Sequence, residues 1–304
     1  MTTLVTRDGG KATKKRARRV LLVASAFLAP FLILSIVFQY GPLLMLVRDS
    51  LFSYRLTNPD AREFVGLQNF IRAFTDPSTV QSLIVTLLFA IGVVILTVPL
   101  AFLLANFLNS KLPARGFVRT LIFLPVVTSA VVVATLWTFL LNNNGLFNSM
   151  LAMFGLGPFD FLTDKSLALP AIIVMSVWQQ IGLATVMYLG GLQSIPGDVV
   201  EAATLDGASA FKRLITITIP LMSRTTVLVV VVMTVFALQS FAPAYVMTAG
   251  APEGTTNTLV YHIYKTAFNL QQPGFASAIS VILLVIAIVI SLVQMRLLRT
   301  RWDY

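Results

Sequence analysis

The sequence predicts an all-α, polytopic membrane protein with six transmembrane helices. Of its 304 residues, 57% are hydrophobic and only 11% are charged, whereas roughly 25% of the residues of an ordinary globular chain are charged. Six stretches contain no Asp, Glu, Lys or Arg, and each can hold the roughly 20 apolar residues that cross a bilayer as a helix. Helices are expected because lipid offers backbone amides no hydrogen-bond partner.

The six spans are expected inside these charge-free stretches, near residues 20–43, 82–108, 120–140, 168–190, 218–244 and 275–295. The first predicted span follows a basic segment, and the apolar core of a secretory signal peptide also follows a basic segment. Its apolar run is much longer than the roughly 7–15 residues of such a core, so we expect an uncleaved helix. Pro99 and Pro125 lie inside the second and third spans, where neighbouring helices can satisfy the backbone groups that proline frees.

Basic residues predict the orientation of the chain. Six spans put both termini on one side, and the segments expected there hold 16 of the 22 Lys and Arg residues: 1–19, 109–119, 193–224 and 296–304. Because cytoplasmic loops are enriched in Lys and Arg, both termini are expected in the cytoplasm. A basic cluster can also indicate nucleic-acid binding. The cluster at 1–19 adjoins a span, however, where it meets anionic lipid, so we expect no nucleic-acid partner.

Three exterior loops are expected, at residues 44–80, 141–167 and 248–274. The first has apolar residues at helical spacing, which predicts an amphipathic helix: Phe64, Leu67, Phe70, Ile71 and Phe74. The second is expected to contain a short interfacial helix near 146–155. The third is expected to be irregular because it contains residues that break regular structure: Gly250, Pro252, Gly254 and Pro273.

Catalytic and metal sites are not expected. The chain has no cysteine, hence no disulfide and no thiolate ligand. Its one histidine, His262, is expected to be exterior and alone, and a metal site needs more ligands. No nucleophile–histidine–acid set or pair of carboxylates lies at membrane depth, which argues against an enzyme. The spans also lack the ionisable groups that ion-driven transporters place inside the membrane.

The long cytoplasmic loop, 193–217, has legible local structure. Asp198 followed by Glu201 predicts a helix N-cap with an acidic residue at the third helical position. Asp206-Gly207 predicts the end of that helix, because glycine readily takes the left-handed conformation. Ser209 is expected to cap a second short helix. Taken singly, each residue is equally compatible with a well-capped surface loop.

The combination is more specific. Glu201-Ala202-Ala203, then Asp206-Gly207-Ala208, then Ile219-Pro220 resembles the EAA loop in permease subunits of binding-protein-dependent ABC importers. The likeness in layout covers about residues 80–297, and an added first span is seen in the sugar-permease branch, which includes maltose, glycerol-phosphate and trehalose types. The resemblance implies the type I ABC importer permease fold. It divides the chain into a basic tail, a first span with its exterior loop, a core and a second tail: 1–19, 20–80, 81–297 and 298–304.

The resemblance also implies a partner for the loop. In that family the EAA helix docks on a separate ATPase, and the matching residues here are Glu201, Ala202, Ala203, Asp206, Gly207, Ala208 and Pro220. This chain lacks the GxxxxGK[ST] phosphate loop, so ATP and Mg²⁺ are expected on the ATPase. The implied assembly contains a second permease, forming a heterodimer, two ATPase subunits and an exterior solute-binding protein, in a bacterial cytoplasmic membrane.

A solute pathway is expected along the fourth and fifth spans, which line the passage in sugar permeases. The candidate residues are Ser176, Gln179, Gln180, Leu183, Met233, Phe236, Gln239 and Ser240. The first four share one helical face, as do Met233, Phe236 and Ser240. Glutamines inside a span are costly without a partner or water, and hydrogen bonding between helices is the alternative. Maltose-type permeases carry asparagines at positions resembling Ala237 and Ser240, so a maltose-like set is not expected.

The segment 247–268 resembles the exterior loop of sugar and glycerol-phosphate permeases, with Ala249-Gly250-Ala251-Pro252 in place of the usual TGGGP. In the family this loop faces the solute-binding protein. An interfacial aromatic belt is the alternative, built from Tyr261, Tyr264 and Phe268. We therefore expect a permease that translocates a sugar or related carbohydrate. A permease for glycerol-3-phosphate, an amino acid or a peptide is the alternative.

Overall fold

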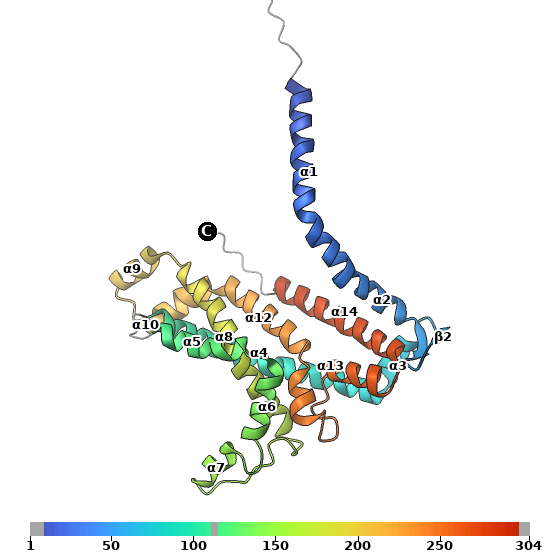
Figure 1. The fold of residues 1–304 in the computed structure, drawn as a ribbon. Coiled ribbons are helices and arrows are strands. Elements are labelled where there is room, and N and C mark those ends of the chain that lie inside the picture. Colours follow the sequence, from blue (N-terminus) through green and yellow to red (C-terminus); the bar gives the residue numbers. More distant parts are fainter. Residues whose placement is uncertain (1–8, 111–114, 298–304) are drawn as a thin grey trace, which may run out of the picture.

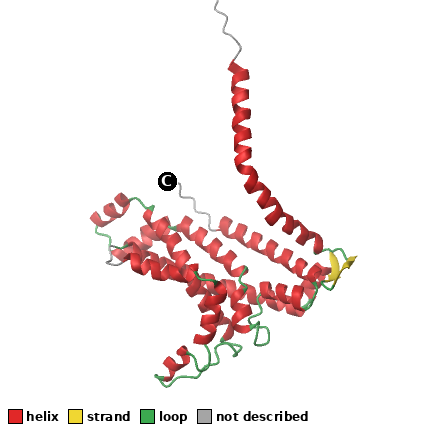
Figure 2. Cartoon of the chain, viewed as in Figure 1, coloured by secondary structure: helices red, strands yellow, loops and turns green. Residues whose placement is uncertain are grey.

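The fold is a bundle of long helices (Figures 1 and 2). The computed structural model describes residues 9–110 and 115–297. Within these ranges five helices are long and apolar enough to cross a membrane: Leu22–Asp49, Pro77–Asn109, Ala168–Gln193, Ser223–Thr248 and Pro273–Leu297. A pair of apolar helices joined by a sharp bend gives a sixth when the pair is counted as one broken span. The prediction of a helical, polytopic membrane protein is confirmed.

The elements follow the predicted order of spans and loops. The first half of the chain contains α1 (Gly9–Ser35), α2 (Gly41–Asp49), β1 (Phe52–Arg55), β2 (Asn58–Phe64), α3 (Gln68–Thr75), α4 (Pro77–Asn109), α5 (Arg115–Val127), α6 (Ala130–Leu140) and α7 (Leu146–Ala152). The second half contains α8 (Ala168–Gln193), α9 (Gly197–Leu205), α10 (Ala210–Arg213), α11 (Ile219–Leu221), α12 (Ser223–Leu238), α13 (Leu259–Tyr264) and α14 (Pro273–Leu297). Four π-helical turns join some of them: Ile36–Tyr40, Leu214–Thr218, Pro243–Thr248 and Lys265–Asn269.

The bundle has two distinct ends in Figure 1. One end carries α9 and α10 and is called the loop end below. The opposite end carries β1, β2 and α3 and is called the hairpin end. Helix α7 matches the interfacial helix expected near 146–155.

Helices α4 and α8 form the centre of the bundle and pack along each other and against α12. Small residues make this possible: Ala101 and Ala105 on α4 and Ala184 on α8 are completely buried. Gly182 brings α8 against α5, because a Cβ atom there would lie 2.3 Å from the carbonyl oxygen of Ile122. Lipid tails are as apolar as leucine, so close packing at small residues is what holds such helices together.

The third span is not the single helix expected over 120–140. It consists of α5 and α6, which meet at a bend of 100°. Thr128 closes a tight turn by donating to the carbonyl oxygen of Pro125 at 3.3 Å, and Ser129 is extended, with φ −54° and ψ 132°. Proline cannot supply an amide hydrogen to the helix, but Pro99 lies inside the unbroken α4. Proline therefore permits the break, and the surrounding packing decides whether it occurs.

The first exterior loop contains a β-hairpin, which the sequence analysis did not predict. Strands β1 and β2 pair antiparallel, with Phe52 opposite Phe64 and their rings in edge-to-face contact at 5.4 Å. The guanidinium of Arg62 lies 4.4 Å from the centre of the Tyr54 ring, an attractive cation–π geometry. The predicted amphipathic helix is present only as α3 (Gln68–Thr75), because the strands occupy the residues before it.

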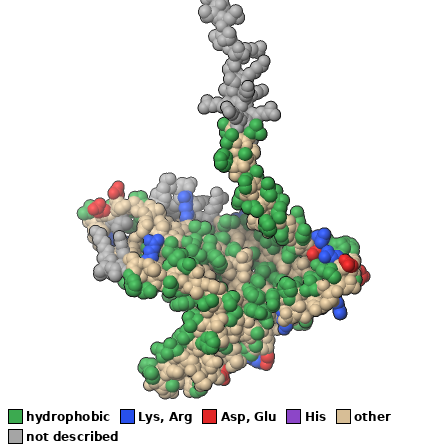
Figure 3. All heavy atoms as spheres, in the orientation of Figure 1, with side chains coloured by type: hydrophobic (Ala, Val, Ile, Leu, Met, Phe, Trp, Pro, Cys, Tyr) green, Lys and Arg blue, Asp and Glu red, His purple; other side chains and the backbone are tan. Residues whose placement is uncertain are grey.

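The first span differs from the rest of the bundle. It begins at Gly9 in α1, well before the expected boundary at residue 20, and continues through α2 to Asp49. In its most apolar window none of the residues is buried, and the helix projects away from the bundle (Figures 1 and 3). Exposed aromatic residues along it include Phe27, Phe31 and Phe38. Its apolar surface is therefore available to lipid or to another chain.

The fifth span and the third exterior loop also depart from expectation. Helix α12 ends at Leu238, and a π-helical turn follows at Pro243–Thr248. The break before Pro243 has a local cause, since proline has no N–H for the carbonyl group four residues earlier. The loop expected to be irregular over 248–274 contains α13 and a π-helical turn. The expected tail at 298–304 and the start of the basic tail, 1–8, lie outside the described residues.

Candidate functional site

The first helix of the loop end, α9, begins differently from the prediction. Its N-cap is Pro196, with no side-chain cap hydrogen bond, so Asp198 is inside the first turn and is not the cap. Glu201 consequently lies past the third helical position. Pro196 has the extended conformation typical of an N-cap, φ −58° and ψ 131°, and already sets the entry of the chain. The Asp198 carboxylate still lies at the positive end of the helix dipole.

The end of α9 confirms the predicted turn. Gly207 has φ +75°, and its amide donates to the carbonyl oxygen of Thr204 at 3.1 Å. The amide of Ala208 donates to the carbonyl oxygen of Ala203 at 3.0 Å. This pair of bonds is the Schellman motif, which satisfies the last carbonyl groups of a helix. The reversal of the chain after α9 is therefore determined by local hydrogen bonding.

The second helix, α10, starts as predicted. The Ser209 hydroxyl accepts from the Lys212 amide at 3.3 Å, which is the capping geometry. The Arg213 guanidinium donates to the carbonyl oxygen of Ala208 at 2.9 Å and so fixes α10 against the turn. Pro220 lies in the first turn of α11, at the entry to the fifth span.

The side chains of this loop differ in exposure. Ala203 is buried, whereas Glu201 and Ala202, which with Leu205 form the exposed tip of the loop, are exposed. Two large apolar residues are also exposed, Leu205 at 86% and Phe211 at 72%. Large exposed apolar side chains, aromatic ones above all, are enriched at protein contact surfaces.

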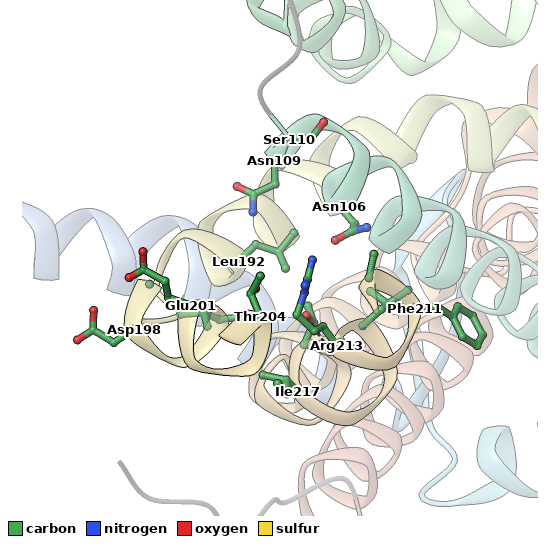
Figure 4. Close-up of a pocket in the computed structure, with 15 residues that line it drawn as sticks. Asn106, Asn109, Ser110, Leu192, Asp198, Glu201, Thr204, Phe211, Arg213 and Ile217 are labelled. Carbon is green, nitrogen blue, oxygen red and sulfur yellow. Dashed lines mark hydrogen bonds between the residues drawn. The ribbon is translucent and has the colours of Figure 1, made fainter. Parts of the chain in front are cut away.

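An open cavity of about 1130 Å³ lies beneath the loop, between α9, α10 and the end of α4. Figure 4 shows Asn106 and Asn109 facing Thr204 and Arg213 across it; Glu201 also lines the cavity, and its exposed carboxylate points away from Arg213. The tip therefore presents its acid to the outside. The polar groups of the loop base face the cavity.

The four candidate pathway residues of the fourth span all lie on α8, as expected, but their side chains differ in exposure. Ser176 and Gln179 are buried, and Gln180 and Leu183 are half-buried. The Ser176 hydroxyl donates to the carbonyl oxygen of Ile172 at 2.7 Å. The Gln179 amide donates to the carbonyl oxygen of Thr128 at 3.4 Å. Gln179 thus reaches the bend between α5 and α6, which is a helix–helix contact of the kind the alternative interpretation foresaw.

The candidates on the fifth span are dispersed more than expected. Met233 is completely buried, whereas Phe236 and Gln239 are exposed. Ser240 lies beyond the end of α12 and not on the helical face of Met233 and Phe236; its carbonyl oxygen accepts from the Thr258 hydroxyl at 3.3 Å. The single-face prediction is wrong for Ser240, because the helix stops before it.

Two polar arrangements escaped the sequence analysis. His262 lies in the expected exterior loop but is buried: it is 5% exposed, and its Nε2 atom lies 3.1 Å from the Thr79 hydroxyl of α4. On the opposite side of the bundle, the Gln294 amide of α14 donates to the Thr234 hydroxyl of α12 at 2.9 Å. The first had a sequence signal, since hydroxyl residues recur at helical spacing along the start of α4.

The sequence pattern of one known family covers most of the chain. The family is described as "Binding-protein-dependent transport system inner membrane component", and its pattern matches residues 97–303. The match includes the whole loop end and all spans from α5 onward. The chain belongs to this family. The region before residue 97, which includes α1 and the hairpin, lies outside the matched part of this inner membrane component.

Curated relatives of this permease align over nearly its full length. The probable ABC transporter permease protein YurN of Bacillus subtilis is 34% identical over 284 residues, which cover 92% of this chain and 97% of the relative. The sn-glycerol-3-phosphate transport system permease protein UgpA of Agrobacterium fabrum is 33% identical and covers 91% and 94%. The trehalose/maltose transport system permease protein MalF of Thermococcus litoralis is 33% identical and covers 80% and 82%.

Solved structures share the fold of the permease. A chain of a bacterial ABC transporter involved in the import of the acidic polysaccharide alginate superimposes with a TM-score of 0.81 at 24% identity, covering 96% of this chain and 100% of the other. The alginate transporter in complex with an alginate pentasaccharide-bound periplasmic protein also gives 0.81, at 25% identity, covering 94% and 96%. The predicted ABC importer permease fold is confirmed.

Proposed function

We propose that this permease is one half of the channel of an ATP-driven importer, and that the tip of α9 receives the force of ATP hydrolysis from a separate ATPase. The observation that carries the proposal is the composition of that tip: Glu201 points outward, Leu205 is 86% exposed, and the turn at Gly207 holds both in place. An exposed tip whose turn is closed by its own backbone hydrogen bonds can transmit a push without unfolding.

The proposed orientation places the loop end in the cytoplasm, with both termini, and the hairpin end outside. The support is the distribution of Lys and Arg, since 16 of the 22 lie in segments assigned to the loop end or the termini. ATP and Mg²⁺ are assigned to two copies of the ATPase, which bind at the loop end. We also assign this chain no enzymatic role of its own.

A second permease subunit is proposed as the partner of α1. Helix α1 has no buried residue in its apolar window and stands apart from the bundle. Its exposed surface fits another helical bundle, and a heterodimer with a similar permease would complete a channel between two halves. An exterior solute-binding protein would dock at the hairpin end.

The proposed solute is a sugar or a related polar carbohydrate. The support comes from sequence relatives. Two relatives whose names refer to trehalose/maltose and to arabinooligosaccharides are 33% and 29% identical to this chain. The relative that transports sn-glycerol-3-phosphate keeps that solute as the alternative. The half-buried and exposed candidates are proposed to line the pathway, Gln180, Leu183, Phe236, Gln239 and Ser240, while the buried Ser176, Gln179 and Met233 support it from behind.

The test is charge reversal at the tip in a reconstituted importer. Glu201→Lys should abolish uptake while the permease still inserts and the ATPase still hydrolyses ATP, because a charge pair that is desolvated at an interface is sensitive to loss of one partner. Asp160→Lys, an exposed acid in the loop after α7 and away from the hairpin end, is the matched control and should keep normal uptake. Normal uptake by Glu201→Lys would refute the proposal.

A further inference from the structure

A stripe of three hydroxyl side chains lies at the hairpin end of α4. Thr79, Ser82 and Thr86 are all buried and fall on one helical face. Each hydroxyl hydrogen has an acceptor within its own chain segment: the Asp76 carboxylate for Thr79 at 2.7 Å, and backbone carbonyl groups at 2.8 Å for Ser82 and Thr86. A hydroxyl has only one hydrogen, so all three oxygens can act only as acceptors toward any other partner.

The segment after the fifth span supplies three matching donors. The Leu259 amide donates to Thr86 at 2.7 Å, and the Asn257 side-chain amide donates to Ser82 at 2.8 Å. The third contact joins the Nε2 atom of His262 to the Thr79 hydroxyl at 3.1 Å, and Nε2 is the donor in one of the two neutral tautomers. These bonds join two segments that are more than 170 residues apart in sequence. They hold residues 257–262 against the start of α4.

These contacts favour one tautomer of the neutral histidine. Thr79 already donates to Asp76, so we assign the hydrogen of the Thr79–His262 contact to Nε2. The Nδ1 atom lies 3.5 Å from the Asn257 side-chain nitrogen, which is a donor, so we assign Nδ1 as the acceptor. The neutral imidazole with its hydrogen on Nε2 satisfies both contacts.

A second proton on His262 has no acceptor. It would sit on Nδ1 and face the Asn257 donor, inside a site from which water is excluded. The Oδ1 atom of Asn257 is buried and has no hydrogen-bond partner. Turning the amide to offer this oxygen to Nδ1 would take the donor away from Ser82. Protonation therefore conflicts with the bonds that join the two segments.

The charged groups around His262 act in opposite directions. Burial is the largest effect and lowers its pKa below the ordinary value of 6.5; the Asp76 carboxylate raises the pKa and the Lys265 ammonium lowers it, and the net shift is downward. Because the pKa is lower in the folded state, the joint is fully stable above about pH 6.5 and weakens as the pH falls from there toward the folded-state pKa. Arg72 on α3 acts on Asp76 rather than on the histidine.

We propose that His262 is a positioning residue that fastens the segment 257–264 to α4 only while its imidazole is neutral, so that mild acid outside the cell loosens this joint and slows import. The inference goes beyond the proposed function but rests on its orientation, which places the hairpin end outside; the joint itself is a property of this chain whatever solute it carries. His262 is the single histidine of the chain, and histidine is the side chain whose ordinary pKa lies in this range.

The test is hydrogen–deuterium exchange of the assembled importer in lipid nanodiscs, purified without a polyhistidine tag. After correction for intrinsic rates, amides in 257–264 should lose protection by up to about tenfold between about pH 7.5 and about pH 5.5, as linkage to a group with an ordinary pKa near 6.5 allows. Peptides from α7, which lies in another exterior loop, serve as the internal reference and should not change. Unchanged protection in 257–264 would overturn the proposal.

Two variants separate this role from simple packing. His262→Gln keeps an N–H donor for Thr79 but does not titrate, so its protection should be independent of pH. Asn257→Asp gives Nδ1 a carboxylate, which favours the protonated imidazole, so acid should increase protection and reverse the wild-type trend. A wild-type pH response in either variant would contradict the proposal, and if His262→Gln does not assemble, Asn257→Asp decides alone. The loss of pH dependence should also appear in uptake by His262→Gln.

Discussion

At the scale of the residue, glycine serves two different purposes in this permease. Gly207 needs no room, since nothing lies within 4 Å of the position its Cβ would take, but its φ of +75° is unfavourable for other residues. Gly182 is the opposite case: its backbone is ordinary, and a Cβ would collide with the carbonyl oxygen of Ile122. The first position was recognisable from Asp-Gly after an apolar helix. The second was not, because nothing in the sequence says which helix lies behind α8.

The conformation of Gly207 leads to a prediction at this scale. Gly207→Ala should weaken the turn after α9 by about 1–2 kcal/mol, the cost of left-handed backbone for a residue with a Cβ. Amide exchange of residues 203–209 measures it. Gly197→Ala in the same helix is the control, because its Cβ also meets open space and its φ is not positive. Equal effects of the two substitutions would show that strain at the turn is not the cause.

The helix caps of α9 and α10 show which local hydrogen bonds can be predicted from the sequence. Ser209 caps α10 as predicted, because the residues that bond lie within three positions of each other. Asp198 does not cap α9, because Pro196 already provides the extended backbone from which the helix starts. Asp and Pro are both compatible with a helix start, and the sequence alone did not decide between the two positions.

At the scale of the element, the hairpin is held by one buried amide. The Asn69 side chain on α3 donates to the carbonyl oxygens of Ser50 at 2.9 Å and Phe52 at 3.0 Å. The hairpin also packs on the first turn of α14, where a Cβ on Gly274 would lie only 1.9 Å from the carbonyl oxygen of Phe52. The extended conformation of β1 therefore depends on contacts with α3 and α14, not on strand propensity alone.

Removal of this amide gives a prediction for the element. Asn69→Leu should destabilise the hairpin, because each buried carbonyl group left without its donor costs about 1–3 kcal/mol. The measurement is thermal unfolding of the purified permease together with amide exchange in 50–64. Gln68→Leu is the control, since the neighbouring side chain is exposed. If both substitutions have the same small effect, the amide does not hold the hairpin.

The bent third span shows what a hydropathy pattern leaves undetermined. Residues 120–140 are apolar, as α5 and α6 confirm, but hydropathy does not say whether the helix axis changes direction within the span. The carbonyl oxygen of Thr128, freed at the bend, accepts from the Gln179 amide of α8. The partner that stabilises the bend is thus about 50 residues away and invisible to any local pattern.

At the scale of the whole molecule, α1 is the part that this chain alone does not explain. An apolar helix with no residue buried against its own bundle can be surrounded by lipid. It can also pack against a partner subunit. If the partner is a second permease, α1 adds contact area between the two subunits. The hairpin end and the loop end would then be joined to their own partners on opposite sides of the membrane.

A photo-crosslinking residue at Phe31 tests this arrangement. Phe31 is 67% exposed on α1, so we expect an adduct with the second permease subunit when the importer is assembled in lipid. The control is the isolated chain with the crosslinking residue at Phe31. In that sample the crosslinker should form no adduct with any other protein. Adducts with lipid only, in the assembled importer, would show that α1 faces the bilayer.

The sequence by itself determined which stretches are apolar enough to cross a membrane, on which side its basic segments are expected, and how the turn between α9 and α10 is built. Those features depend on hydropathy, charge and hydrogen bonds between residues close together in the chain. Only the tertiary structure decided the bend between α5 and α6, the hairpin, and the buried state of His262. Each of these depends on a contact between distant segments, because a buried polar group is stable only where another segment supplies its hydrogen-bond partner.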